Sequence, residues 1–310
     1  MIYLDNAATT PVPATVADTM YDVLTHHFGN TSSQYPAGQE MKKAVEGWRA
    51  VIAGALHCPP ERLYFTSCGT ESDNWAMQAA IWQGRHTGKH IITTAVEHSA
   101  VLESCRWLES EGYQVTYLKP DSTGMVSARQ VLDAVREDTV LVSMMLVNNE
   151  NGCRLPVENV FRMVKRNDPE IITHCDAVQG FLKIPFKPRT LCADLVSVSG
   201  HKVHALKGVG ALYIRHGVRV KPILCGSEQE RGLRPGTESV PLIASFGAAT
   251  EKLSLNIEER LERVSQLRSS LIAQLREMDG VIIRDIEGAS PYVLNISLLG
   301  YRSEIVLHYL

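Results

Sequence analysis

A lysine that closes a buried strand is the first feature of this sequence with chemical potential. Lys202 follows the apolar run "CADLVSV" (192–198) and stands beside Ser199 and His201 in "SVSGHKVHALKGVGAL" (197–212). Burial near other cations lowers the pKa of a lysine and makes its amine a nucleophile, but desolvating the charge is costly. The alternative is a lysine with a buried stem whose charged end reaches solvent, and Lys202 alone does not decide between them.

A glycine turn follows another predicted strand. In "SCGTES" (67–72), Gly69 and Thr70 stand where a helix begins. The free amides and the positive end of a helix dipole make such a turn an anion cradle. The alternative is a capping box, with Thr70 as the cap and Asp73 answering it.

Three more strand ends carry polar side chains. His98 follows "HIITTAVE", Asn149 lies in "VNNENG", and Asp176 with Gln179 lies in "HCDAVQG". Each has an ordinary interpretation as a helix cap or a turn residue. A carboxylate that ends an apolar strand nevertheless needs a partner.

The elements that must position these residues alternate between strands and helices. Such alternation predicts βαβ units, a largely parallel sheet buried on both faces, and ligands beyond the carboxyl ends of its strands. Seven β-branched, apolar runs are predicted strands: 62–67, 90–94, 114–118, 140–146, 171–175, 194–198 and 210–214.

The pattern changes after residue 240. Residues 241–278 predict one long or broken helix, followed by two strand-like runs and a final helix in which the sequence stops. We therefore expect a large domain over 15–240 and a smaller, incomplete α+β domain over 241–310. Residues 1–14 are expected to belong with the small domain.

Taken together, the strand ends match the needs of one cofactor. Pyridoxal 5′-phosphate (PLP) requires an anion site for its phosphate, a carboxylate for its pyridine nitrogen and a donor for its 3′-oxygen. It also requires a flat group against its ring and a lysine for its aldehyde. The combination predicts a PLP site, which outweighs the ordinary interpretation of each residue.

Eight motifs in this order also resemble a known family. The chain is similar to cysteine desulfurases of the NifS/IscS type, in the class V aminotransferase group of PLP fold type I enzymes. The resemblance runs from residue 3 to the end of the sequence and implies a mostly parallel seven-stranded sheet between helices. Its motifs are "YLDNAATTP", "FGNTSS", "FTSCGTESDNWA", "EH", "VNNENG", "HCDAVQ", "SVSGHKVHALKGVGALY" and "QERGLRPGTES".

The resemblance implies a role for each matching residue. Lys202 would form the Schiff base with the cofactor, and His98 would stack on the ring and shuttle protons. Asp176 would pair with the pyridine nitrogen and Gln179 with the phenolic oxygen. Further cofactor contacts are implied for Gly69, Thr70, Ser199, His201, Asn149 and, in a homodimer, for Thr237, which would reach the phosphate of the neighbouring subunit. Substrate contacts are implied for Ala7, Asn30 and Asn149.

The implied reaction converts L-cysteine to L-alanine. A mobile cysteine of the enzyme takes the sulfur as a persulfide and passes it to an acceptor protein for Fe–S cluster assembly or for tRNA or cofactor thiolation. We expect that cysteine, and an arginine for the substrate carboxylate, beyond residue 310. Cys68 and Cys175 are near the inferred cofactor but on rigid elements, and "CGSEQERG" (225–232) departs from the family's usual run of glycines.

Two alternatives stay open at this stage. One is a related enzyme, a selenocysteine lyase or a small-substrate class V aminotransferase. The other is a PLP-binding scaffold without desulfurase activity, because the nucleophilic cysteine loop is absent from these 310 residues.

Composition excludes several other classes. The formal net charge is −3, without a basic arm, so we expect no direct nucleic-acid partner. No apolar stretch reaches the roughly 18–20 residues of a membrane span, and the first residues lack the pattern of a signal peptide. Seven cysteines without a CxxC pair predict a reduced, cytoplasmic protein with no metal site.

Overall fold

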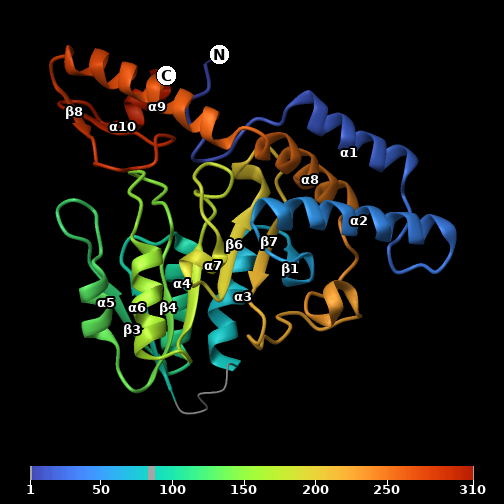
Figure 1. Cartoon of the computed structure of the whole chain (residues 1–310). Helices are drawn as coiled ribbons and strands as arrows, with labels where there is room; N and C mark the ends of the chain where they lie inside the picture. Colours follow the sequence, from blue (N-terminus) through green and yellow to red (C-terminus); the bar gives the residue numbers. More distant parts are fainter. Residues whose placement is uncertain (1, 83–87, 310) are drawn as a thin grey trace.

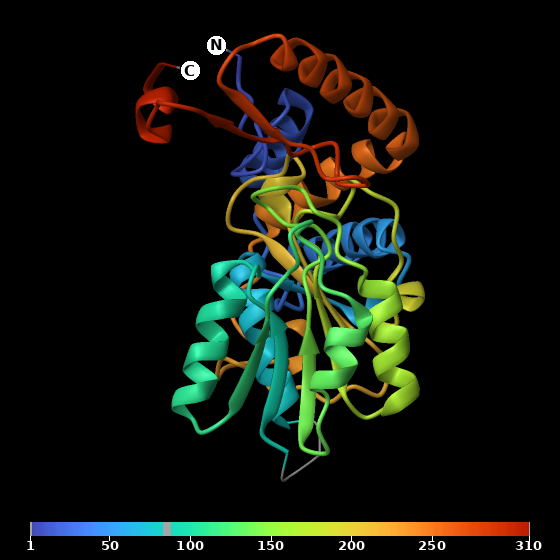
Figure 2. The same cartoon turned by 90° about the vertical axis from the view of Figure 1, so that its left-hand side faces the viewer.

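A computed structural model describes residues 2–82 and 88–309 of the chain. Its centre is a seven-stranded sheet with helices on both faces, and a smaller two-stranded sheet lies near the C-terminus (Figures 1 and 2). The strands of the large sheet are β1 (Leu63–Thr66), β2 (His90–Thr94), β3 (Gln114–Leu118), β4 (Thr139–Ser143), β5 (Ile172–Asp176), β6 (Leu195–Ser199) and β7 (Gly210–Ile214).

The order of strands in the large sheet is β1-β7-β6-β5-β4-β2-β3. β7 runs antiparallel to both of its neighbours, and the other adjacent pairs are parallel. The carboxyl ends of β2, β4, β5 and β6 therefore meet at one edge of the sheet. The predicted mostly parallel, seven-stranded sheet is confirmed.

Burial explains why these runs form strands. Every residue of β1, β2, β4, β5, β6 and β7 is buried, whereas β3, at the edge, is partly exposed. Near-continuous apolar strands are typical of parallel sheets covered on both faces. The helices are α1 (Ala14–His26), α2 (Pro36–Ala55), α3 (Gly69–Trp82), α4 (Ser99–Ser110), α5 (Ala128–Ala134), α6 (Val157–Asn167), α7 (Pro188–Leu191), α8 (Val240–Ser254), α9 (Ile257–Arg276) and α10 (Ser303–Tyr309).

The C-terminal part lies over the edge of the sheet at which the parallel strands end (Figure 2). The predicted helix over 241–278 is broken at residues 255–256 into α8 and α9. α8 packs against α1 and α2, and α9 packs against the small sheet of β8 (Val281–Arg284) and β9 (Asn295–Leu298). The Ser290 amide donates to the Gly152 carbonyl at 2.8 Å, which joins this part to the loop after β4. The domain boundaries stay a prediction.

The N-terminal segment crosses the same edge of the sheet. The amide of Thr10 donates to the His201 carbonyl at 3.0 Å, and its hydroxyl donates to the same carbonyl at 2.8 Å. The His204 amide donates in turn to the Thr10 hydroxyl at 2.7 Å. These bonds fix Thr10 against the turn that follows β6. Among the described residues, no helix is long and apolar enough to cross a membrane.

Candidate active site

Lys202 lies in a short 3₁₀ turn, Gly200–Lys202, that follows β6 directly. A side chain at Gly200 would meet Val209, since its Cβ would come within 2.9 Å of the valine Cγ1. The half-buried Lys202 donates from Nζ to the carbonyls of Ala7 and Ala8, the latter at 2.9 Å. Its ammonium is therefore tied to the N-terminal segment and does not simply extend into solvent.

Burial sets the chemistry of this lysine. Desolvation lowers the pKa of Lys202, and the nearby carboxylates of Asp176 and Asp5 partly oppose that shift. A lowered pKa raises the fraction of free amine near neutral pH, which is the form that attacks an aldehyde.

Asp176 is the last residue of β5 and is 5% exposed. Its Oδ1 accepts a hydrogen bond from the Val178 amide at 2.9 Å, so Asp176 also stabilises the turn that follows β5. Burial raises the pKa of Asp176, while the Val178 amide and the neighbouring His98 and Lys202 oppose that shift. No cation of the described residues lies within ion-pair distance of this carboxylate.

Gln179 follows one turn later and joins the same network. Its Nε2 donates to the Ala7 carbonyl at 2.8 Å, and its Oε1 accepts from Nζ of Lys183 at 2.8 Å. The Ala7 carbonyl thus accepts from both Gln179 and Lys202.

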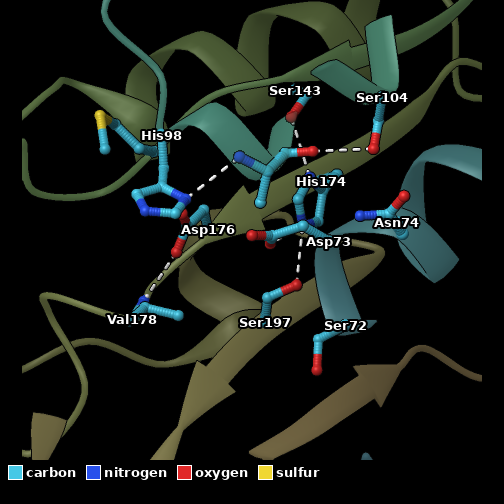
Figure 3. Close-up of polar contacts among 12 residues, drawn as sticks. Ser72, Asp73, Asn74, His98, Ser104, Ser143, His174, Asp176, Val178 and Ser197 are labelled. Atoms are coloured by element: carbon cyan, nitrogen blue, oxygen red, sulfur yellow. Dashed lines mark hydrogen bonds and ion pairs between the residues drawn. The ribbon is translucent and has the colours of Figure 1, made fainter. Parts of the chain in front are cut away.

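His98 is the N-cap of α4, and its ring also faces Asp176. Its Nδ1 accepts from the Ala100 amide at 3.1 Å, so the neutral ring carries its proton on Nε2. Figure 3 shows the ring beside the Asp176 carboxyl group. His98 therefore caps α4 and also lies beside Asp176.

The helix α3 begins in the glycine turn, next to the Ser199 hydroxyl, which has no hydrogen-bond partner among the described residues. α3 begins at Gly69, and a Cβ there would come within 2.9 Å of Val178 Cγ2 and 3.4 Å of Ser199 Cβ. The buried Oγ of Ser199 has no hydrogen-bond partner among the described residues. The first amides of a helix likewise lack partners within the helix, so this corner can bind an anion.

The alternative of a capping box at Thr70 is wrong. The helix starts at Gly69, two residues earlier than a cap at Thr70 requires, and no hydrogen bond joins Thr70 to Asp73 in the described residues. Asp73 points instead into the protein, where it is 1% exposed and its Oδ1 lies 3.6 Å from Nε2 of His174.

His201 lies on the other side of Lys202. Its Nδ1 contacts the Thr9 hydroxyl at 3.3 Å. Burial lowers its pKa to about 4, and the charges of Lys202, Lys207, Lys183 and His98 add to the shift. The ring is therefore neutral near pH 7.

Three predicted residues lie away from this cluster. Asn149, half-buried, donates to the Glu150 carboxylate at 2.7 Å in the turn after β4. Asn30, exposed in the loop between α1 and α2, accepts from the Ser32 amide at 2.9 Å. Thr237 is exposed in the loop before α8. No described contact connects any of the three to Lys202 within this chain.

A polar layer that the sequence motifs did not indicate lies behind Asp176. Figure 3 shows His174 between Ser143 and Ser197, with hydrogen bonds of 2.9 and 3.0 Å from its two nitrogens. Burial lowers the pKa of His174 to about 3, so the ring is neutral. The signal was present, because His174 and Asp176 are two residues apart on one strand and so face the same side.

Glu97 and Lys183 were also missed. Glu97 accepts from the Thr94 hydroxyl at 2.6 Å and from the Met145 amide at 2.9 Å, and its Oε2 has no partner among the described residues. Burial raises the pKa of Glu97 to about 8, with a contribution from Asp176. Lys183 stands four residues after Gln179, a spacing that could have suggested their contact.

Comparisons with known proteins agree with one another. The aminotransferase class-V family model matches residues 2–310. The cysteine desulfurase IscS of Methanosarcina thermophila is 46% identical over 274 residues, which cover 88% of this chain and 67% of that protein. A solved NifS-like protein superposes with a TM-score of 0.96 at 39% identity, over 99% of this chain and 84% of that one. A structure titled SspA in complex with cysteine has a TM-score of 0.88 at 32% identity, over 100% of this chain and 86% of that one.

Proposed function

Because the chain belongs to the class V aminotransferase family and, within it, to the cysteine desulfurases, we propose that its site binds PLP on Lys202 and takes L-cysteine as substrate. The family and the fold class expected from the sequence motifs are confirmed. The complex of the related SspA with cysteine supports the choice of substrate.

Three features of the site fit the cofactor. The unpartnered Ser199 hydroxyl and the start of α3 suit a phosphate, and a side chain at Gly69 would crowd the corner between them. Asp176 is buried without a cationic partner, and a protonated pyridine nitrogen would supply one. The lowered pKa of Lys202 suits an amine that reacts with an aldehyde.

The residues around the site can then be given roles. Asp176 would hold the proton on the pyridine nitrogen, and Nε2 of Gln179 would donate to the phenolic oxygen. Gly69, Thr70, Ser199 and the neutral His201 would hold the phosphate. When bound, PLP supplies an electron sink for the electrons released from the Cα–H bond of the substrate. His98 can hold or pass a proton at Nε2, because Nδ1 is occupied by the Ala100 amide.

Substrate contacts are proposed for Ala7, Asn30 and Asn149. Ala7 is supported most directly, because its carbonyl accepts from both Lys202 and Gln179. The support for Asn30 and Asn149 is their position in the motifs shared with the family.

Four of the seven cysteines are poor candidates for the sulfur-accepting nucleophile. Burial raises the pKa of Cys58 and of Cys105 to about 12, and it also raises the pKa of Cys153 and of Cys175. Since the thiolate is the nucleophile, a raised pKa removes the reactive form. We propose that the persulfide forms on a cysteine outside this group, from which an acceptor protein takes the sulfur.

We further propose a homodimer in the cytoplasm. Thr237 is exposed in its own chain and has no described contact with Lys202, which supports a role in the site of a second copy. All seven cysteines are free, as in proteins of reducing compartments.

A spectroscopic test addresses the cofactor first. The purified protein reconstituted with PLP should be yellow, and borohydride should fix the cofactor to the chain. Lys202→Ala should abolish the colour, whereas Lys207→Ala, at an exposed lysine five residues on, should keep it. Alanine formed from L-cysteine in proportion to the sulfur released would support the reaction. A colourless wild-type protein in excess PLP contradicts the proposal.

A further inference from the structure

A second buried lysine lies next to the proposed cofactor site. Lys183 is 7% exposed, although it carries an amine that prefers water. Its contacts are the Gln179 Oε1 at 2.8 Å and the ring of Tyr292, whose centroid is 6.0 Å from Nζ. Among the described residues, no carboxylate lies within ion-pair distance of Nζ. A buried ammonium without a carboxylate is costly, so its position calls for a functional reason.

The backbone holds this lysine in place. Leu182, the residue before it, has a φ of +56°, an uncommon value for a residue with a branched side chain. The Leu182 carbonyl accepts from Nη2 of Arg260 on α9 at 3.0 Å. The turn that directs Lys183 inward is therefore stabilised from the C-terminal part of the chain.

Lys183 and the Ala7 carbonyl together fix which end of the Gln179 amide faces the site. A charged ammonium can only donate, so the oxygen of the amide must face it. The nitrogen then faces the Ala7 carbonyl, where Lys202 also donates. Without Lys183, the buried Oε1 of Gln179 would lose its donor.

The charges around Lys183 are mostly positive. Lys202, in the turn after β6, and Arg260, in the C-terminal part, are cationic, whereas His201 and the Tyr292 hydroxyl are neutral near pH 7. Burial and the nearby Lys202 lower the pKa of Lys183 to about 7. A negative ligand oxygen near Gln179 would relieve this excess of positive charge.

We propose that Lys183 is a positioning residue for the phenolic side of the bound cofactor, because its ammonium orients the Gln179 amide and adds a positive charge next to Lys202. The inference rests on the proposed function, since it assumes that Gln179 faces the phenolic oxygen. It assigns to Lys183 a role through Gln179, with no contact between Lys183 and the substrate.

The test is a pH titration of the visible absorption of the bound cofactor. Removing a neighbouring cation makes protonation at Lys202 easier, so Lys183→Met should raise the midpoint by about one pH unit. Lys183→Arg keeps the charge and the donors, and its midpoint should stay within about 0.3 unit of the wild type. Lys187→Met, at an exposed lysine of the same segment, serves as the matched control.

The outcomes separate this inference from the proposed function. If Lys183→Met is yellow but its midpoint matches that of Lys187→Met, the inference is overturned while the proposed function stands. A colourless wild-type protein overturns both. Should Lys183→Met not fold, Lys183→Gln replaces it, and the difference between Lys183→Gln and Lys183→Arg decides the question in the same way.

Discussion

Removing one partner of a buried ion pair at the free edge of β1 should be among the most destabilising single substitutions in this chain. Arg49 on α2 and Glu230 in the loop before α8 are both buried, and their two hydrogen bonds measure 2.7 and 2.8 Å. β1 has a neighbour on one side only. On the other side, Arg49 donates to the Leu63 carbonyl at 3.0 Å, and the Phe65 amide donates to Glu230 at 2.9 Å. The pair thus occupies the position of a missing strand.

The two single substitutions should differ in cost. Breaking a buried pair costs about 3–5 kcal/mol, because one charge is left uncompensated. In Glu230→Gln, the half-exposed Glu46, 3.1 Å from Arg49, still offsets the charge, so we expect about 3 kcal/mol. Arg49→Met leaves Glu230 buried without a cation, so we expect about 5 kcal/mol. With an unfolding entropy of roughly 2.1 cal/mol/K per residue, these values correspond to a fall in Tm of about 5–8 °C.

Urea unfolding of the apoprotein measures the effect. The double variant Arg49→Met/Glu230→Gln should lose clearly less free energy of unfolding than the two single variants added together. Once one partner has been replaced, the ion pair is already broken, so replacing the other partner breaks no further interaction. The control is Arg129→Met, which breaks the exposed pair with Asp133 on α5 and should cost no more than about 0.5 kcal/mol. The reasoning is wrong if Glu230→Gln lowers the free energy of unfolding no more than Arg129→Met does. It is also wrong if the loss in the double variant equals the sum of the losses in the two single variants.

Three further predictions concern the site. Asp176→Asn should keep the bound colour but lower turnover of L-cysteine by about 10²–10³-fold, since the partner of the pyridine nitrogen is lost; unchanged turnover would count against its role. Gly69→Val should weaken PLP binding at least about tenfold in an absorbance titration, because its Cβ would come within 2.9 Å of Val178, whereas Gly47→Val has open space and should bind normally. The pKa of Glu97 is about 8 in the folded protein and about 4.5 in the unfolded chain. Between these two values the folded state holds a proton that the unfolded chain has released, so the free energy of unfolding should fall as the pH rises from about 4.5 to about 8. Glu97→Gln should flatten this fall in apoprotein urea titrations, and an identical slope would contradict it.

The strands could be predicted because their signal is local. Each of the seven runs is β-branched and apolar, and each forms a strand of the large sheet. The boundaries differ in places: the strand predicted over 140–146 is β4, which ends at Ser143. Met144 and Leu146 still donate to the carbonyls of His174 and Asp176, so the segment continues beside β5 without regular pairing.

The gathering of side chains at the strand ends could also be predicted, because parallel strands end at one edge of a sheet. Lys202, Asp176 and His98 lie together for this reason. The N-terminal segment carries no such signal. Its bonds to His201 join residues 191 apart, and only the resemblance to a family indicated that Ala7 belongs to the site.

The division of charge within the site is the part that no local pattern could supply. Three carboxyl groups, those of Asp73, Glu97 and Asp176, lie buried on one side, and they cannot all ionise at low cost. Burial and the charge of Asp176 raise the pKa of both Asp73 and Glu97, and burial also raises that of Asp176, where the Val178 amide, His98 and Lys202 oppose the shift. Ionisation is therefore least costly at Asp176, which faces the cations, and more costly at the two deeper groups. Which of the three carboxyl groups ionises most easily depends on which one faces the cations. That is set by the packing of α3, β2 and β5 against one another, and no single element determines it.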